Sequence, residues 1–200
     1  YRRADAYQEA TACLVEALAE SRAMNDERHA ADTLYHLGTV AWSNGQNDQA
    51  IGFHQQAVEI CERTGCTDLV AVQAWHGRGE AHFANAEPAA AIECYTRSLE
   101  LARGIGDKSY ESENLMMIGH ACVGTKGLGD YPRATAHFEA ALDIARAADL
   151  QWHFGPTLLG LDHVRACTGR YGEAWTGMQK TLHWLESLSQ VRYQLIAYDF

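Results

Sequence analysis

Apolar residues recur along the chain at intervals of three and four positions, which is the spacing of one face of an α-helix. Strand-like alternation between turn residues is missing, and alanine, leucine, glutamate and glutamine favour helix intrinsically. We therefore expect an all-α fold. The pattern predicts helices over about 5–24, 28–44, 47–63, 68–84, 88–104, 108–125, 131–147, 154–168, 171–187 and 191–200.

The helical pattern repeats with a period of about forty residues. An alanine heads the same motif at Ala10, Ala50, Ala91, Ala134 and Ala174. A small residue follows seven positions after each alanine, and a bulky one stands between them: Leu14, His54, Tyr95, Phe138 and Met178. Small residues on one helix face let a neighbouring backbone approach closely, and the bulky residue fills the groove between the helices. The repeat is therefore a packing pattern.

Helix ends recur with the same period. Fifteen residues after each alanine stands a residue type that tolerates the left-handed conformation or caps a helix: Asn25, Gly65, Gly106, Asp149 and Ser189. Each unit is thus predicted to be a pair of antiparallel helices, with full units at about 28–66, 67–107, 108–150 and 151–189 and partial units at 1–25 and 190–200. Pro156 predicts that the eighth helix begins nearby or bends. Because both ends fall inside a unit, we expect a fragment of a longer protein or an end that self-associates.

The stretch "LGTVAWSNGQNDQAIGFHQQAV", Leu37 to Val58, resembles the tetratricopeptide repeat (TPR). It carries the Leu-Gly pair of that family, the turn glycine Gly45, and the small residues Ala50 and Ala57. The resemblance implies a right-handed superhelical solenoid over residues 1–200. The forty-residue units are similar to the long repeats of Pins-type cell-polarity adaptors and of large bacterial signalling regulators and cyclases. Arg78 and Asp162 depart from the family pattern.

The resemblance also implies a concave groove lined by the first helix of each unit. Family groove positions map mainly onto aromatic, methionine, histidine and glutamate residues: Tyr35, Thr39, Trp42, His76, Glu80, Phe83, Met116, His120 and His163. Exposed apolar patches mark interaction sites, so a protein partner supplying a peptide or helix is expected in the groove. Alternatively, Trp42 and Phe83 pack against neighbouring helices as core residues. Family members that bind the carboxyl terminus of heat-shock chaperones resemble one another in presenting Lys, Asn and Arg at these groove positions, where they hold carboxylates. Other residues stand at these positions here, which argues against that subtype.

Charge and composition narrow the class of partner. The formal net charge of −10 at pH 7 disfavours nucleic acid and anionic membranes. No apolar run reaches eighteen residues and no signal peptide is evident, so a soluble, cytoplasmic protein is expected. The six cysteines lack zinc-site spacing and are interpreted as small core residues. The sequence leaves the oligomeric state open.

Several residues raise the question of chemistry. His76, Glu80, His120 and His163 face the predicted groove, but adjacent units lie about 10 Å apart, which disfavours shared metal ligation. Histidines with ordinary pKa values near 6.5 would instead make partner binding pH-dependent. His163 and Cys167 stand one turn apart without an orienting group or oxyanion donor. "GTKGLGD", Gly124 to Asp130, lacks the spacing of a phosphate loop and is interpreted as a lengthened turn.

These observations predict a protein–protein interaction module with a scaffold or adaptor role. We expect no enzymatic activity, no cofactor and no metal. The alternative, from a different functional class, is the sensory or regulatory arm of a multidomain signalling protein, whether an ATPase, a nucleotide cyclase or a transcription regulator. The sequence next to this chain would separate the two.

Overall fold

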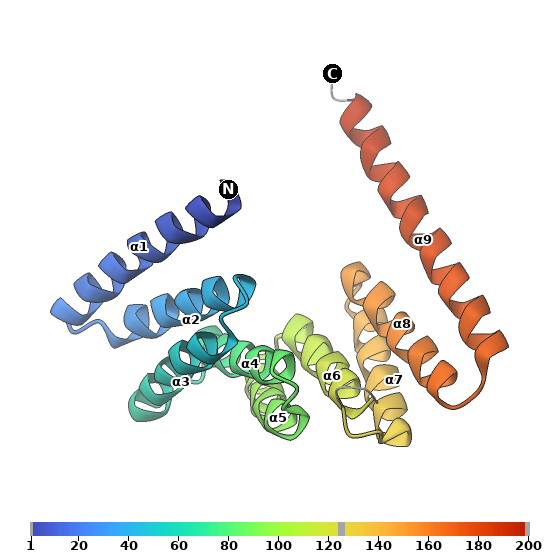
Figure 1. The fold of residues 1–200 in the computed structure, drawn as a ribbon, viewed down its shortest axis with the longest axis horizontal. Coiled ribbons are helices and arrows are strands. Elements are labelled where there is room, and N and C mark those ends of the chain that lie inside the picture. Colours follow the sequence, from blue (N-terminus) through green and yellow to red (C-terminus); the bar gives the residue numbers. More distant parts are fainter. Residues whose placement is uncertain (1, 124–126, 199–200) are drawn as a thin grey trace.

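A computed structural model describes residues 2–123 and 127–198, with side chains over residues 7–123 and 127–187. The described residues form helices and no strands, which confirms the all-α prediction (Figure 1). The helices are α1 Arg2–Ala23, α2 Glu27–Ser43, α3 Asn47–Thr64, α4 Leu69–Ala84, α5 Pro88–Ile105, α6 Lys108–Cys122, α7 Tyr131–Ala147, α8 Gln151–Cys167 and α9 Tyr171–Tyr198.

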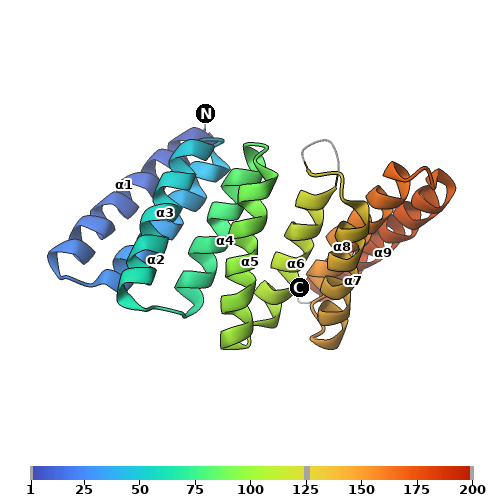
Figure 2. The ribbon, with the colours of Figure 1, turned by 90° about the horizontal axis from the view of Figure 1, so that it is seen from below.

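Consecutive helices pack as antiparallel pairs that stack in series into an arch. The helices α2, α4, α6 and α8 line the inner side of this arch, and α1 and α9 rise at its two ends (Figure 1). The outer layer consists of α3, α5 and α7 (Figure 2). Along the inner layer, α2 touches α4, α4 touches α6 and α6 touches α8, with α4 and α6 in less extensive contact than α2 and α4. We call the side formed by α2, α4, α6 and α8 the inner face.

The helices α1, α3, α5 and α7 end where the repeat pattern predicts. Gly65 and Gly106 adopt left-handed φ values of 71° and 74°, and Asn25 and Asp149 reach 53° despite carrying side chains. A left-handed residue turns the chain while its N–H satisfies a carbonyl of the last helical turn. Several helices begin at an aspartate whose side chain accepts from a backbone N–H within the first turn, as the N-cap position requires: Asp26, Asp68, Asp107 and Asp130.

The packing pattern read from the repeat is confirmed at the side-chain level. The small residues of the full motifs are fully buried, including Ala50, Ala57, Ala134 and Ala141. His54, Tyr95 and Phe138 are buried too, and each lies against a glycine of the inner layer, whereas Leu14 and Met178 are half-buried. A Cβ added at Gly38, Gly79 or Gly119 would lie 2.5, 2.6 or 2.8 Å from His54, Tyr95 or Phe138, respectively. These glycines are therefore required by the close approach of the bulky side chains.

The structure departs from the predicted helices near the end of the chain. The helices predicted at 171–187 and 191–200 are one continuous α9 across the described residues, because the segment around Ser189 contains no glycine or proline to interrupt it. The eighth helix begins at Gln151, before Pro156, which lies inside it. Asp162 stands at a position where the family pattern has glycine, and it is buried. Its carboxylate fits because Gly177, which faces it, has no side chain. The carboxylate forms an ion pair with Arg165.

The remaining features are local. The predicted helix at 108–125 ends at Cys122, and residues 124–126 of the predicted turn lie outside the described residues. Cys61, Cys94 and Cys122 are buried as expected, whereas Cys13 and Cys167 are exposed, so their interpretation as core residues is wrong. No helix among the described residues combines the length and apolar content that crossing a lipid bilayer requires.

Candidate functional site

The inner face begins on α2 with three of the predicted groove residues. Tyr35, Thr39 and Trp42 are spaced four and three residues apart and therefore share one face of the helix. The residues of the neighbouring face, Leu34, Leu37 and Ala41, are buried. Trp42 is 38% exposed and Tyr35 is half-buried, while the Thr39 hydroxyl donates to the Tyr35 carbonyl at 3.1 Å. Trp42 is the most exposed of the predicted groove aromatics and is accessible to a partner.

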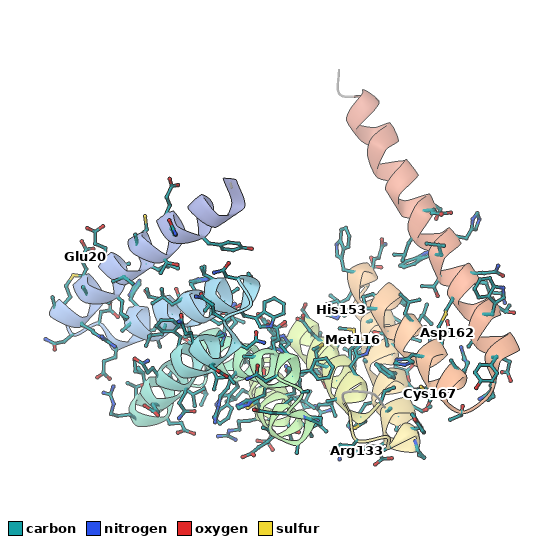
Figure 3. All side chains as sticks on the ribbon, viewed as in Figure 1. Glu20, Met116, Arg133, His153, Asp162 and Cys167 are labelled. Atoms are coloured by element: carbon teal, nitrogen blue, oxygen red, sulfur yellow. The ribbon has the colours of Figure 1, made fainter. Side chains whose placement is uncertain are left out.

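The groove residues of α4 and α6 are more buried than their positions suggest. Phe83 and Met116 are partly buried and pack against the hydrophobic core built around Tyr95, Phe138 and Leu115. Met116 nevertheless lies on the inner side of the arch, opposite Arg133 on the outer side (Figure 3). Phe83 and Met116 are therefore part core and part surface, because α4 and α6 pack against the outer helices as well as against their inner neighbours.

The histidines of the inner face differ in environment. His163 on α8 is exposed, as is Cys167 one turn later. His120 packs edge-on against Phe138, with ring centroids 4.9 Å apart. Burial, reinforced by nearby His163, lowers the pKa of His120 to about 4. His120 therefore stays neutral between pH 5.5 and 7.5, and the expectation of an ordinary pKa near 6.5 is wrong for it.

A buried polar network runs between α4, α5 and α6. His76 Nδ1 lies 2.9 Å from Asn114 Oδ1, and both side chains are buried. The Asn114 amide nitrogen donates to the Ser98 hydroxyl at 2.9 Å and to the Tyr110 carbonyl at 2.8 Å. Ser98 in turn donates to the Val72 carbonyl at 2.8 Å. The amide nitrogen of Asn114 is identified by the two acceptors that it faces, so the oxygen of the amide faces His76. Since that oxygen can only accept, His76 Nδ1 is the protonated donor of this hydrogen bond.

This network was missed by the sequence analysis. Ser98 occupies the position that is alanine at Ala17, Ala57 and Ala141, so a hydroxyl stands where the packing pattern needs only a small side chain. The serine at this position was the one sign in the sequence of a buried hydrogen bond. The helical spacing does not predict that its partner is Asn114, sixteen residues later. A related arrangement joins the next units, where Ser112 donates to the Ala141 carbonyl at 3.0 Å and His153 Nδ1 lies 3.1 Å from the Ser112 hydroxyl oxygen.

Two carboxylates flank the outer edge of the His76 ring. His76 Nε2 lies 3.9 Å from Glu80 Oε1 on its own helix and 3.8 Å from Glu113 Oε1 on α6. These distances exceed hydrogen-bond range. Burial raises the pKa of the Glu80 carboxyl, His76 opposes this and Glu113 adds to it. The predicted groove residues His76 and Glu80 are thus brought together, and Glu113 joins them from the next unit.

Aromatic hydroxyls surround the same region. Gln73 on α4 and Tyr35 on α2 lie close enough to Tyr110 on α6 to affect the pKa of its hydroxyl, which burial raises. Side chains from three successive inner helices therefore meet in the middle of the inner face. Within the described residues, no group of three histidine, cysteine, aspartate or glutamate side chains is close enough to hold a metal ion. The arrangement offers acceptors and aromatic surface.

Two sequence profiles, both described as tetratricopeptide repeat, match the chain at residues 30–64 and 70–147. These ranges contain α2, α3 and the helices from α4 to α7, which carry most of the inner face. No curated protein is significantly similar to the chain in sequence.

Solved structures of several proteins share this fold. BtubC (BKLC) from P. vanneervenii superposes with a TM-score of 0.80 at 16% identity, over 94% of this chain and 76% of that one. The apo form of RapI has a TM-score of 0.70 at 19% identity, over 82% of this chain and 58% of RapI. A Rap protein complexed with competence and sporulation factor has a TM-score of 0.73 at 20% identity, over 96% and 54%. The chain thus spans little more than half of the two Rap structures.

Proposed function

Starting from a chain that belongs to the tetratricopeptide repeat family, we propose a protein-interaction module that binds a peptide or helix of a partner protein along the inner face. The observation that carries the proposal is Trp42, an exposed aromatic on the helix face it shares with Tyr35. Exposed aromatic side chains that adjoin other apolar groups mark interaction surfaces. The part-exposed Phe83 and Met116 continue this surface along the next two inner helices.

The expected role is that of a scaffold or adaptor without chemistry of its own. The matched family is a repeat that usually mediates contacts between proteins. The Rap structure with the same fold is complexed with competence and sporulation factor, which supports ligand binding by an array of this kind. The net charge of −10 favours a partner with positive charge.

Two single variants test the proposal. Trp42→Ala should abolish partner binding and leave the helical circular dichroism unchanged, since the side chain lies at the surface and outside the buried core. Phe83→Ala should weaken binding and also lower stability, because its ring packs against the core. Binding would be measured with the full-length protein and with this chain in parallel pull-downs. Unaltered binding by both variants would contradict the proposal.

A regulatory arm of a multidomain signalling protein is the second candidate. It rests on the partial coverage of the Rap structures, which contain sequence beyond the matched part, and on the similarity of the forty-residue units to those of signalling regulators. In this case the inner face would bind a ligand and the effector would lie outside residues 1–200. An ATPase, cyclase or DNA-binding segment encoded next to this chain would decide for this role.

A further inference from the structure

Two carboxylates from neighbouring units meet in the middle of the inner face. Asn114 Oδ1 lies 2.9 Å from His76 Nδ1, which leaves His76 Nε2 on the side of the carboxylates. The carboxylate oxygens of Glu80 and Glu113 lie 3.9 and 3.8 Å from that second nitrogen. Both distances exceed hydrogen-bond range, so neither carboxylate is hydrogen-bonded to His76.

No arginine or lysine of the described residues pairs with these carboxylates. Their recorded ion-pair partner is His76 alone, whereas Glu111, in the same unit as Glu113, pairs with both Arg103 and Lys108. Glu80 and Glu113 remain accessible, with side chains 29% and 37% exposed. Two carboxylates from neighbouring units thus lie around one nitrogen without an arginine or lysine partner among the described residues.

A second observation concerns the side chain of Tyr95, which lies near Glu80 and Glu113. Tyr95 is fully buried, and its hydroxyl has no hydrogen-bond partner among the described residues. Its ring packs against Gly79, next to Glu80, and lies 5.5 Å from the His76 ring. The hydroxyl is near enough to Glu80 and Glu113 for both carboxylates to raise its pKa, although burial is the larger cause. A buried polar group without a partner is costly, so a ligand that reaches it gains a hydrogen bond.

We propose that Glu80 and Glu113 anchor an arginine side chain of the bound peptide or helix. A guanidinium has five N–H donors and no acceptor, and its planar fork suits carboxylates, which makes it complementary to an acceptor-only site. The two carboxylate oxygens lie within 3.9 Å of the same nitrogen, so the two groups are close enough for a single guanidinium to meet both. The net charge of −10 favours the same kind of partner.

The inference rests on the proposed function and deepens it, because it names the chemistry of the partner at one position. A metal ion fits less well, since no metal-binding group of three side chains exists within the described residues. A lysine would carry the charge but supply fewer and less directional donors, so arginine should be preferred over lysine at this position.

The test uses a randomised peptide library displayed on phage and selected on this chain. The expected result is a set of peptides with arginine enriched at one position. The strongest peptide and a copy with citrulline at that position would then be compared by fluorescence anisotropy. Citrulline keeps the shape of arginine without its charge, so affinity for the wild type should fall about 10- to 100-fold.

The protein variant Glu80→Gln/Glu113→Gln should bind both peptides with similar, weak affinity, because glutamine keeps the shape of glutamate and removes its charge. Glu93→Gln/Glu100→Gln, at exposed positions on the outer helix α5, is the matched control and should discriminate like the wild type. Circular dichroism would verify that both variants fold.

Three outcomes separate this inference from the proposed function. Peptides that lose binding with Trp42→Ala but show no arginine position would overturn the inference and leave the proposed function standing. Discrimination between arginine and citrulline that survives in Glu80→Gln/Glu113→Gln would overturn the inference as well. If the library yields no peptide, or only peptides whose affinity does not change with Trp42→Ala, both the inference and the proposed function are overturned.

Discussion

His54 offers a direct test of how this array packs. Its ring is 1% exposed and fills a slot between α2 and α4, where a Cβ added at Gly38 or Gly77 would lie 2.5 Å away. Phe138 fills the corresponding slot between Gly119 and Gly160 at similar distances. His54 Nδ1 is buried without a hydrogen-bond partner among the described residues. His54→Phe should therefore fit the slot and remove a buried polar atom.

The magnitude follows from burial and from pH. Removing an unsatisfied polar atom gains about 1 to 3 kcal/mol, part of which the larger ring offsets, so we expect about 1 kcal/mol of added stability at pH 7.5. Burial, with a smaller contribution from His76, lowers the pKa of His54 from 6.5 to about 4. A lowered histidine pKa means that the unfolded chain takes up the proton first, so stability is lost as pH falls from about 6.5 towards 4. Between pH 7.5 and 5.5 this loss is about 1.3 kcal/mol for His54.

The assay is urea unfolding followed by circular dichroism at pH 7.5 and 5.5, for the wild type and for His54→Phe. The stability difference between the two proteins should grow from about 1 kcal/mol at pH 7.5 to about 2.3 kcal/mol at pH 5.5. His183→Gln, at an exposed position on α9, should stay within about 0.5 kcal/mol of the wild type at either pH. A difference that does not change with pH, or a variant less stable than the wild type at pH 7.5, would refute the reasoning.

Two further predictions concern packing and the polar network. Ala57→Leu and Ala141→Leu should each lower the unfolding free energy by roughly 1 to 3 kcal/mol through overpacking, and neutral behaviour of both in urea unfolding would contradict the packing pattern. Asn114→Ala should cost about 1 to 3 kcal/mol, because it leaves the buried His76 Nδ1 without its acceptor. The same measurement on Gln56→Ala, whose exposed side chain donates to the Gly52 carbonyl, is its control and should show a change below about 0.5 kcal/mol.

The inner face shows how far a repeat pattern predicts a site. Mapping family positions placed Tyr35 and Trp42 on one face of α2, and the structure leaves Trp42 exposed there. The same mapping treated His76 as a surface ligand, but its ring is 5% exposed and hydrogen-bonded to Asn114. Helical spacing specifies the direction in which a side chain leaves its helix. It does not specify how closely the next helix approaches, and that distance decides whether a groove position is surface or core.

The sequence by itself determined the elements and their order of packing. Helix formation, left-handed ends at Gly65 and Gly106, and the alternation of small and bulky residues depend on neighbours within one or two turns, so they are readable from the chain. Where a local stop signal was weak, as at Ser189, the prediction failed and α9 continued.

Only the tertiary structure decided which polar groups meet and how their protons are arranged. Glu80 and Glu113 come from different units, and Asn114 reaches Ser98 across a helix boundary. The lowered pKa of His120 likewise arises from burial against Phe138 on the adjoining helix. Hydrogen bonds form over about 3 Å and desolvation depends on every neighbouring atom, whereas a periodic pattern locates side chains only to within a helical turn.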